Sequence, residues 1–312
     1  MPSRQSTDSI MMIRPVRFRM NEQTAVNNYY QKILDNLDPN QVQEKAQQEF
    51  DEFVEELRDK GINVIVIDDT PDPDTPDSIF PNNWVSFHND GRVGLYPMFA
   101  ENRRLERRED ILETLKRSFE INEVIDFSKY EQEGKYLEGT GSMILDRPNK
   151  VCYAAISERT QTDVLDEFCR QFGYEAVKFV ANQTVGEKRL PIYHTNVMMC
   201  VAEDFAILCA DSIDDEKERK AVIDKLKGHG KEVITITEEQ KHHFAGNMLQ
   251  VQSNRGEKYL VMSEAAYQSL SEQQISNIEK HCQIIHSSLD TIEALGGGSA
   301  RCMMAEIFLP KK

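Results

Sequence analysis

The 312-residue sequence lacks the features of several broad protein classes. It has no compact basic stretch, and 37 Lys and Arg against 53 Asp and Glu give a formal net charge of −16, so nucleic acids and anionic membranes are poor partners. Its longest apolar runs, such as VIVI at 64–67, are strand-sized, whereas a membrane-spanning helix needs roughly 20 residues. The N-terminus has no apolar segment of signal-peptide length. We therefore expect a cytoplasmic protein without a nucleic-acid or membrane partner.

The six cysteines lack the spacings that mark a disulfide framework or a zinc site. Neither CxxC nor CxH occurs in the sequence. Most of these cysteines are interpreted as small buried hydrophobic residues. We expect neither a metal nor another cofactor.

An internal repeat is the strongest pattern that the sequence does contain. Five amphipathic helical segments are each followed by a β-rich run, and the runs recur at intervals of 51 to 59 residues. These runs are GINVIVID from 61, EINEVIDF from 120, GYEAVKFV from 173, GKEVITIT from 230 and HCQIIHSS from 281. A second marker, an aromatic residue or leucine before a small or polar cluster, recurs five times with nearly the same period. Its copies are FPNNWVSF from 80, YLEGTGSMIL from 136, YHTNVMMCV from 193, FAGNMLQV from 244 and LGGGSARCMMAEIF from 295.

Such a repeat predicts an α/β fold in which the units pack side by side, because one unit cannot bury its own faces. We expect a closed five-bladed α/β propeller with a central active-site cavity, in which MIRPVRFRM at 12–20 supplies a strand that completes the ring. A linear solenoid is the alternative, but solenoids need polar capping repeats and none is evident. Residues 1–11 are expected to form a disordered tail, and residues 12–312 a single domain.

In a ring, equivalent positions of the blades face the same central cavity. The five clusters therefore bring together Asn82, Asn83, Glu138, His194 and Cys302. A cysteine, a histidine and a glutamate in one cavity can serve as nucleophile, acid–base group and polar anchor. One histidine and one carboxylate are too few ligands for a catalytic metal.

The context of Cys302 favours a nucleophile over a core cysteine. The glycines at 296–298 allow the backbone to approach a ligand, and Arg301 places a cation beside the thiol. A nucleophilic cysteine needs a lowered pKa, which nearby positive charge supplies. The simpler alternatives are a hydrogen-bonded structural role for His194 and a surface turn for Glu138.

These motifs resemble those of the arginine deiminase, dimethylarginine hydrolase and glycine amidinotransferase superfamily, whose fold is the five-bladed propeller called a pentein. The similarity runs from RPVRFRMN to GGGSARCMMAEIFLP. The set FPNNW, LEGTGSM, HTNVMM and GGGSARCM looks most like the citrulline-utilisation hydrolase branch.

The resemblance implies covalent catalysis at a guanidino or ureido carbon. Cys302 would attack that carbon, His194 would protonate the departing nitrogen and then activate water, and Glu138 would hold substrate nitrogens and orient His194. The substrate-binding residues that we expect around these three are Asp77, Phe80, Asn82, Asn83, Asn196 and Arg301.

Departures from the superfamily pattern favour citrulline as substrate. Guanidine-modifying relatives typically carry an aspartate at the positions of Asn83, Gly141 and Asn196. A guanidinium cation prefers carboxylate partners, whereas an amide can both donate to and accept from a neutral ureido group. The expected products are ornithine, ammonia and carbon dioxide.

Three alternatives remain open at this stage. They are an arginine deiminase, an amidinotransferase that passes the amidino group to an amine, and a non-catalytic pentein binding protein. The arginine that binds the substrate's carboxylate and the oligomeric state, for which a homodimer is one option, are also open.

Overall fold

Five three-stranded sheets share one topology in the computed structural model, which describes residues 4–31 and 38–312. In each sheet the central strand pairs antiparallel with one neighbour and parallel with the other. The sheets are β17–β1–β2 (Ala305–Glu306, Ser9–Arg14, Asn63–Asp68), β3–β4–β5 (Val85–Phe87, Arg92–Leu95, Glu123–Asp126), β6–β7–β8 (Ile144–Asp146, Val151–Ala155, Glu175–Phe179), β11–β12–β13 (Met199–Val201, Phe205–Leu208, Glu232–Thr235) and β14–β15–β16 (Leu249–Gln252, Lys258–Ser263, Gln283–Ser287). This repetition confirms the predicted five-bladed α/β propeller.

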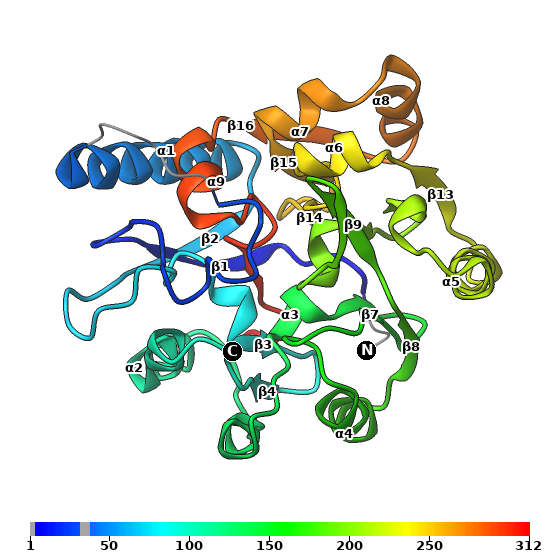
Figure 1. Ribbon diagram of the computed structural model, residues 1–312. Coiled ribbons are helices and arrows are strands. Elements are labelled where there is room, and N and C mark those ends of the chain that lie inside the picture. The colour runs from blue at the N-terminus through cyan, green and yellow to red at the C-terminus, as the bar shows by residue number, and fades with distance from the viewer. Residues whose placement is uncertain (1–3, 32–37) are drawn as a thin grey trace.

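Several helices lie on the outside of the ring of sheets (Figure 1). They are α1 (Pro39–Asp59), α2 (Glu109–Leu115), α4 (Thr162–Phe172), α5 (Glu216–Gly228), α7 (Glu264–Ser269) and α8 (Glu272–Glu279). Helix α4 illustrates their sequence pattern, because its buried residues Val164, Leu165, Phe168 and Phe172 form one apolar stripe. The helical period in the sequence therefore identifies the side of each helix that packs against its blade.

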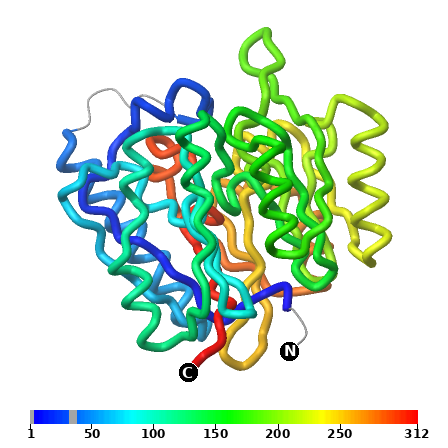
Figure 2. The backbone as a smooth tube through the Cα atoms, turned by 90° about the horizontal axis from the view of Figure 1, so that it is seen from below, coloured from blue at the N-terminus to red at the C-terminus, as the bar shows by residue number. Residues whose placement is uncertain are grey.

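Other helical elements mark the turns and connections. These are α3 (Gly139–Ser142), α6 (Glu238–His242) and α9 (Asp290–Gly296), with the 3-10 turns η1 (Pro81–Asn83), η2 (Asn102–Glu106), η3 (Ser128–Glu133), η4 (Thr195–Val197) and η5 (Ala210–Ser212). A two-stranded hairpin, β9–β10 (Asn182–Val185, Lys188–Pro191), projects from the end of the ring opposite to the chain's C-terminus (Figure 2).

The two ends of the chain close the ring within one blade. Strand β1 lies between β17, with which it pairs antiparallel through Met11 and Ala305, and β2, with which it pairs parallel. The predicted closing strand is therefore present, but it covers Ser9–Arg14 rather than 12–20. Pro15 follows directly and, because it lacks an N–H group, is unsuited to continue a central strand.

The prediction of a disordered tail over residues 1–11 is wrong for residues 4–11, and residues 1–3 lie outside the described part. Ile10 and Met11 are buried in β1. The Gln5 side chain donates to the carbonyl oxygens of Leu145 (3.0 Å) and Val201 (2.8 Å), which belong to two different blades. A polar composition therefore did not imply disorder here, because backbone groups of other blades satisfy these side chains. The extent of the single domain stays a prediction.

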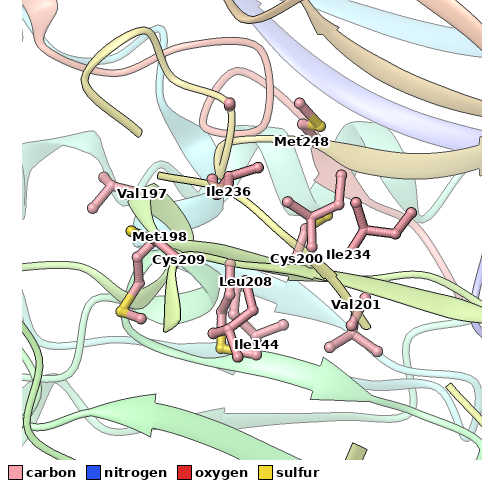
Figure 3. Packing of buried hydrophobic residues seen from close by; sticks show 14 of the residues in the cluster. Ile144, Val197, Met198, Cys200, Val201, Leu208, Cys209, Ile234, Ile236 and Met248 are labelled. Atoms are coloured by element: carbon pink, nitrogen blue, oxygen red, sulfur yellow. The ribbon is translucent and has the colours of Figure 1, made fainter. Parts of the chain in front are cut away.

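Neighbouring blades share their hydrophobic cores. Figure 3 shows Met198, Cys200 and Leu208 packed near Ile144, which comes from the preceding blade, and Met248, which comes from the following one. All six cysteines are buried. No helix in the described ranges has the length and apolar character needed to cross a membrane.

Candidate active site

The turns that precede the first strand of each blade meet near the centre of the ring. Thr140 Oγ1 in α3 donates to the carbonyl oxygen of Asn82 in η1 (3.2 Å). Thr195 Oγ1 in η4 donates to the carbonyl oxygen of Ser142 (2.6 Å). These bonds between blades hold the repeated clusters in fixed positions relative to one another.

A small cavity lies beside these turns and contains the expected nucleophile and acid–base group. It is lined by Thr24, Asn28, Asp77, Phe80, Asn83, Arg103, Arg159, Tyr193, His194, Gly296, Gly297, Gly298 and Cys302. Five of the nine predicted site residues therefore line one cavity. A sixth, Glu138, lies directly behind His194.

Glu138 and His194 form a buried pair. His194 Nε2 is 2.6 Å from Glu138 Oε2, and Glu138 Oε1 accepts from the Phe99 N–H group (2.9 Å). Burial alone would raise the pKa of Glu138, but the Arg159 guanidinium, 3.5 Å away, and the bond to His194 hold that pKa well below its usual range. Glu138 is therefore an ionised acceptor, and Nε2 of His194 carries the hydrogen.

The second ring nitrogen of His194 is consequently available for proton transfer. Burial lowers the pKa of His194, and Arg159 and Arg103 add to that effect against the opposing influence of Glu138. In the neutral imidazole, protonation at Nε2 leaves Nδ1 with a lone pair. His194 is thus a neutral base whose protonated form Glu138 would stabilise.

Cys302 is 4% exposed, and its sulfur accepts two amide hydrogen bonds. Asn196 Nδ2 lies 3.2 Å and Asn247 Nδ2 lies 3.3 Å from Cys302 Sγ. The sequence predicted substrate binding for Asn196, whereas the structure directs its amide nitrogen to the thiol. Asn247 was not predicted.

The substrate side of the cavity carries polar atoms that lack partners among the described residues. Asn83 Oδ1 accepts from Arg103 (2.8 Å), which leaves Asn83 Nδ2 unpaired. Asp77 Oδ2 accepts from Asn21 (2.8 Å) and lies 3.8 Å from Arg103 Nε, while Asp77 Oδ1 is unpaired. Burial raises the pKa of Asp77 against the opposing charge of Arg103.

Two of the three glycines before Cys302, Gly296 and Gly298, make room for Phe80. A Cβ atom at Gly296 would lie 2.7 Å from Phe80 Cζ, and one at Gly298 would lie 2.9 Å from Phe80 Cε1. The predicted approach of this segment to a ligand stays a prediction, whereas its close approach to Phe80 is observed. Phe80 and the loop at 296–298 together form one wall of the cavity.

Three of the predicted substrate-binding residues are not among those that line this cavity, and one of them, Asn196, bonds the thiol as described above. The guanidinium of Arg301 bonds Glu306 Oε2 (2.7 Å) and the carbonyl oxygen of Met304 (2.9 Å), and it lines a different cavity. The prediction that Arg301 supports the thiol and binds substrate is therefore wrong, because adjacent side chains in this tight turn point to different sides. Asn82 is fully buried, and it is not among the residues that line the cavity.

Gly141 also differs from the sequence interpretation, which treated it as the position of a missing substrate carboxylate. A Cβ atom there would lie 2.4 Å from Asn83 Nδ2 and 2.9 Å from His194 Nδ1. No side chain fits at this position without displacing those groups.

The sequence interpretation missed several residues of the site. Arg159, which is 2% exposed, follows β7 outside the repeated clusters, so no pattern marked it. Thr24 and Asn28 come from the segment between β1 and α1 and have no counterpart in the repeat. Arg103 was one of several unranked arginines. Asn247 could have been found, because FAGN at 244–247 repeats the Phe-x-x-Asn of FPNN at 80–83.

Comparison with known proteins identifies a family. The family model described as eukaryotic N,N-dimethylarginine dimethylhydrolase matches residues 14–309. No curated protein sequence matches the chain.

Solved structures support the same fold. ArgZ, described as an arginine dihydrolase from the ornithine–ammonia cycle in cyanobacteria, superposes with a TM-score of 0.74 at 16% identity over 97% of this chain and 41% of its own. Its N-terminal domain, in a cysteine-to-serine mutant bound to substrate, is covered to 98% with a TM-score of 0.73 and 16% identity over 97% of this chain. A dimethylarginine dimethylaminohydrolase adduct with S-methyl-L-thiocitrulline gives a TM-score of 0.63 at 15% identity over 96% of this chain and 98% of its own.

Proposed function

The chain belongs to the N,N-dimethylarginine dimethylhydrolase family of hydrolases, which act on carbon–nitrogen bonds, and we propose that it hydrolyses a ureido amino acid through a covalent intermediate on Cys302. Citrulline is the proposed substrate, and ornithine, ammonia and carbon dioxide are the proposed products. The observation that carries this choice is the unpaired N–H donor of Asn83 at the cavity.

Asn83 presents a donor because Arg103 fixes the orientation of its amide. With Oδ1 accepting from Arg103 Nη1, only Nδ2 remains for a ligand. A guanidinium group has no acceptor for this donor, whereas a ureido carbonyl oxygen has two lone pairs. The unpaired oxygen of Asp77, which lines the cavity, can accept from a ureido N–H group.

The arginines of the cavity supply the partner that an α-amino acid needs for its carboxylate. Arg103 is held by Glu106 (2.8 Å), whereas Arg159 Nε has no partner among the described residues. Arg159 also lies over the ring of Tyr193, 4.9 Å from its centroid, which fixes the plane of the guanidinium. We assign Arg159 as the first candidate for carboxylate binding.

Cys302 and His194 would carry the chemistry. His194 Nδ1 takes the thiol proton, and Sγ attacks the ureido carbon. The protonated His194 gives its proton to the departing amino group, so that ammonia leaves and a thiocarbamate remains on Cys302. His194 then deprotonates a water molecule, which attacks the thiocarbamate and releases the thiolate. The resulting carbamate loses carbon dioxide to give ornithine.

Arginine or dimethylarginine is the second candidate substrate, and one observation favours it. Asp77 Oδ1 is a buried carboxylate oxygen without a partner among the described residues, which suits a guanidinium N–H group. ArgZ and the dimethylarginine dimethylaminohydrolase are also described as acting on arginine and dimethylarginine, respectively.

Product analysis decides between these substrates. The purified protein is incubated separately with citrulline, arginine and N,N-dimethylarginine, and amino acids and ammonia are followed by mass spectrometry. Ornithine formed from citrulline by the wild type, but not by Cys302→Ser, is the expected result. Cys282→Ser, which changes another buried cysteine away from the cavity, serves as the matched control.

Other outcomes would overturn parts of the proposal. If citrulline forms from arginine or dimethylarginine and citrulline itself is not turned over, the proposed substrate is wrong, while the proposed role of Cys302 as nucleophile stands. Transfer of the amidino group to added glycine would indicate an amidinotransferase. Turnover of none of the three substrates would favour a non-catalytic binding protein.

A further inference from the structure

The immediate surroundings of Cys302 Sγ are unusual for a nucleophilic thiol. Within the described residues, the hydrogen bonds that reach the sulfur come from two neutral amides, those of Asn196 and Asn247. The ionisable groups that face the same cavity are Asp77, Arg103, Arg159, Tyr193 and His194.

The cations of the cavity are engaged elsewhere. Arg103 bonds Glu106 and Asn83, and Arg159 bonds the carbonyl oxygen of Thr24 and lies near Glu138. The side chain of Arg301 lies in the other cavity and bonds Glu306. Charge from an adjacent arginine therefore does not explain how the thiol ionises.

Three hydrogen bonds fix the amide of Asn247. Its Oδ1 accepts from the backbone N–H of Arg301 (3.1 Å), so a flipped amide would place two donors against each other. Its Nδ2 donates one hydrogen to the carbonyl oxygen of Asn196 (3.0 Å) and lies 3.3 Å from Cys302 Sγ. The second hydrogen of Nδ2 is thus directed at the sulfur before any substrate arrives.

We propose that Asn247 is a catalytic residue whose amide N–H stabilises the Cys302 thiolate, with Asn196 as the second donor. This inference rests on the proposed role of Cys302 as nucleophile. A hydrogen bond to an ionised acceptor is stronger than one to a neutral acceptor, so two donors aimed at the sulfur favour the thiolate over the thiol. Because the donors are neutral, they do so without repelling a substrate of either charge.

The fold explains why this asparagine is available. Asn247 in its turn corresponds to Asn83 in the turn before β3, since the N–H group of each donates to the carbonyl oxygen of a phenylalanine three residues earlier. Asn83 bonds Arg103 and faces the substrate, whereas Asn247 faces the nucleophile. The same position of the repeat therefore holds an asparagine that faces the substrate cavity in one blade and an asparagine that bonds Cys302 Sγ in another.

The pH dependence of Cys302 alkylation tests the proposal without any substrate. The rate of carbamidomethylation by iodoacetamide is followed on the Cys302 peptide by mass spectrometry from about pH 5 to about pH 10. We expect Asn247→Ala to move the half-maximal rate to higher pH, so that the rate near neutrality falls about tenfold for each unit of that movement. The rate at the alkaline plateau should be retained.

Two further variants separate electrostatics from structure. Asn247→Asp keeps an acceptor for the Arg301 N–H group but places an anionic oxygen at the position of Nδ2, so it should move the profile further than Asn247→Ala. Gln250→Ala removes a buried amide side chain that does not bond the sulfur, and its profile should coincide with that of the wild type. Circular dichroism and urea unfolding identify any variant that fails to fold, in which case Asn196→Ala gives the same test at the second donor.

The outcomes distinguish this inference from the proposed function. Coincident profiles for folded Asn247→Ala, Asn247→Asp and the wild type would overturn the role of Asn247. Shifted profiles in a protein that turns over none of the tested substrates would support the role of Asn247 and overturn the proposed function. Turnover by Cys302→Ser would overturn both.

Discussion

Arg301 and Cys302 are adjacent in sequence, yet their side chains enter two cavities of opposite character. The Arg301 cavity is lined by Gln5, Thr140, Cys200, Glu306 and their neighbours, and none of its lining side chains carries a buried polar atom without a partner among the described residues. In the Cys302 cavity, Asp77, Asn83 and Arg159 each carry one. Because burial of an unpaired polar group is unfavourable, such atoms indicate where a ligand completes the hydrogen bonds. The pairing state of buried polar groups therefore separates a structural cavity from a binding cavity.

The largest expected effect is at Cys302. Cys302→Ser should lower kcat by at least about a thousandfold, because the hydroxyl is a far weaker nucleophile, while the free energy of unfolding changes by no more than about 1 kcal/mol. Steady-state kinetics and urea denaturation of the same preparation measure both quantities. A large loss of stability would contradict the assignment of Cys302 to function rather than structure.

Arg301→Met should give the reverse pattern. It leaves Glu306 buried without its closest cation, so we expect the free energy of unfolding to fall by about 3 kcal/mol. Arg301→Met combined with Glu306→Gln should recover part of that loss in urea denaturation. If folded Arg301→Met is inactive but as stable as the wild type, the structural role that we assign to the Arg301 cavity is wrong.

Gly141→Ala sharpens the comparison within the catalytic side. The added methyl group must displace Asn83 Nδ2 or His194 Nδ1, and a displacement on the order of 1 Å reduces kcat/KM by roughly a hundredfold. Gly228→Ala, at the end of α5, is the matched control, because a Cβ atom added there would have no neighbouring side chain or loop atom within 4 Å. Equal kcat/KM values for both variants would show that the position of the Asn83 and His194 side chains is not critical.

The smallest expected effect concerns pH. Since the neutral form of His194 accepts the thiol proton and burial lowers its pKa, the acidic limb of kcat/KM should have its midpoint below 6.5. The unfolded chain takes up this proton at higher pH than the folded protein, so the same group makes the free energy of unfolding decrease as pH falls through 6.5. His194→Gln should flatten that part of the stability profile. A midpoint of the acidic limb above pH 6.5 would contradict the assignment of His194 as a neutral imidazole beside ionised Glu138.

The sequence repeat was sufficient for the fold and for the proximity of three candidate catalytic side chains. Five copies of one pattern imply five equivalent blades, and equivalence alone brings Glu138, His194 and Cys302 to one place. The repeat did not identify Arg159, which lies outside the pattern. It also did not predict the position of the Arg301 side chain, because neighbouring residues in a tight turn point to different sides and a repeat of this length does not specify which side each one takes. It also gave no sign that residues 4–8 are ordered, because their partners are backbone groups more than 100 residues away.

The pairing of β1 with β17 also determines when the protein can become active during its synthesis. The nucleophile lies three residues before β17, and that strand can dock only after Ala305 and Glu306 have been added to the chain and have left the ribosome. A nascent chain that ends between His194 and Cys302 contains His194 and Glu138 but has no positioned thiol. Strand β17 follows the strands of the other four blades in the sequence, so its docking positions the sulfur in the cavity only after those blades have been made.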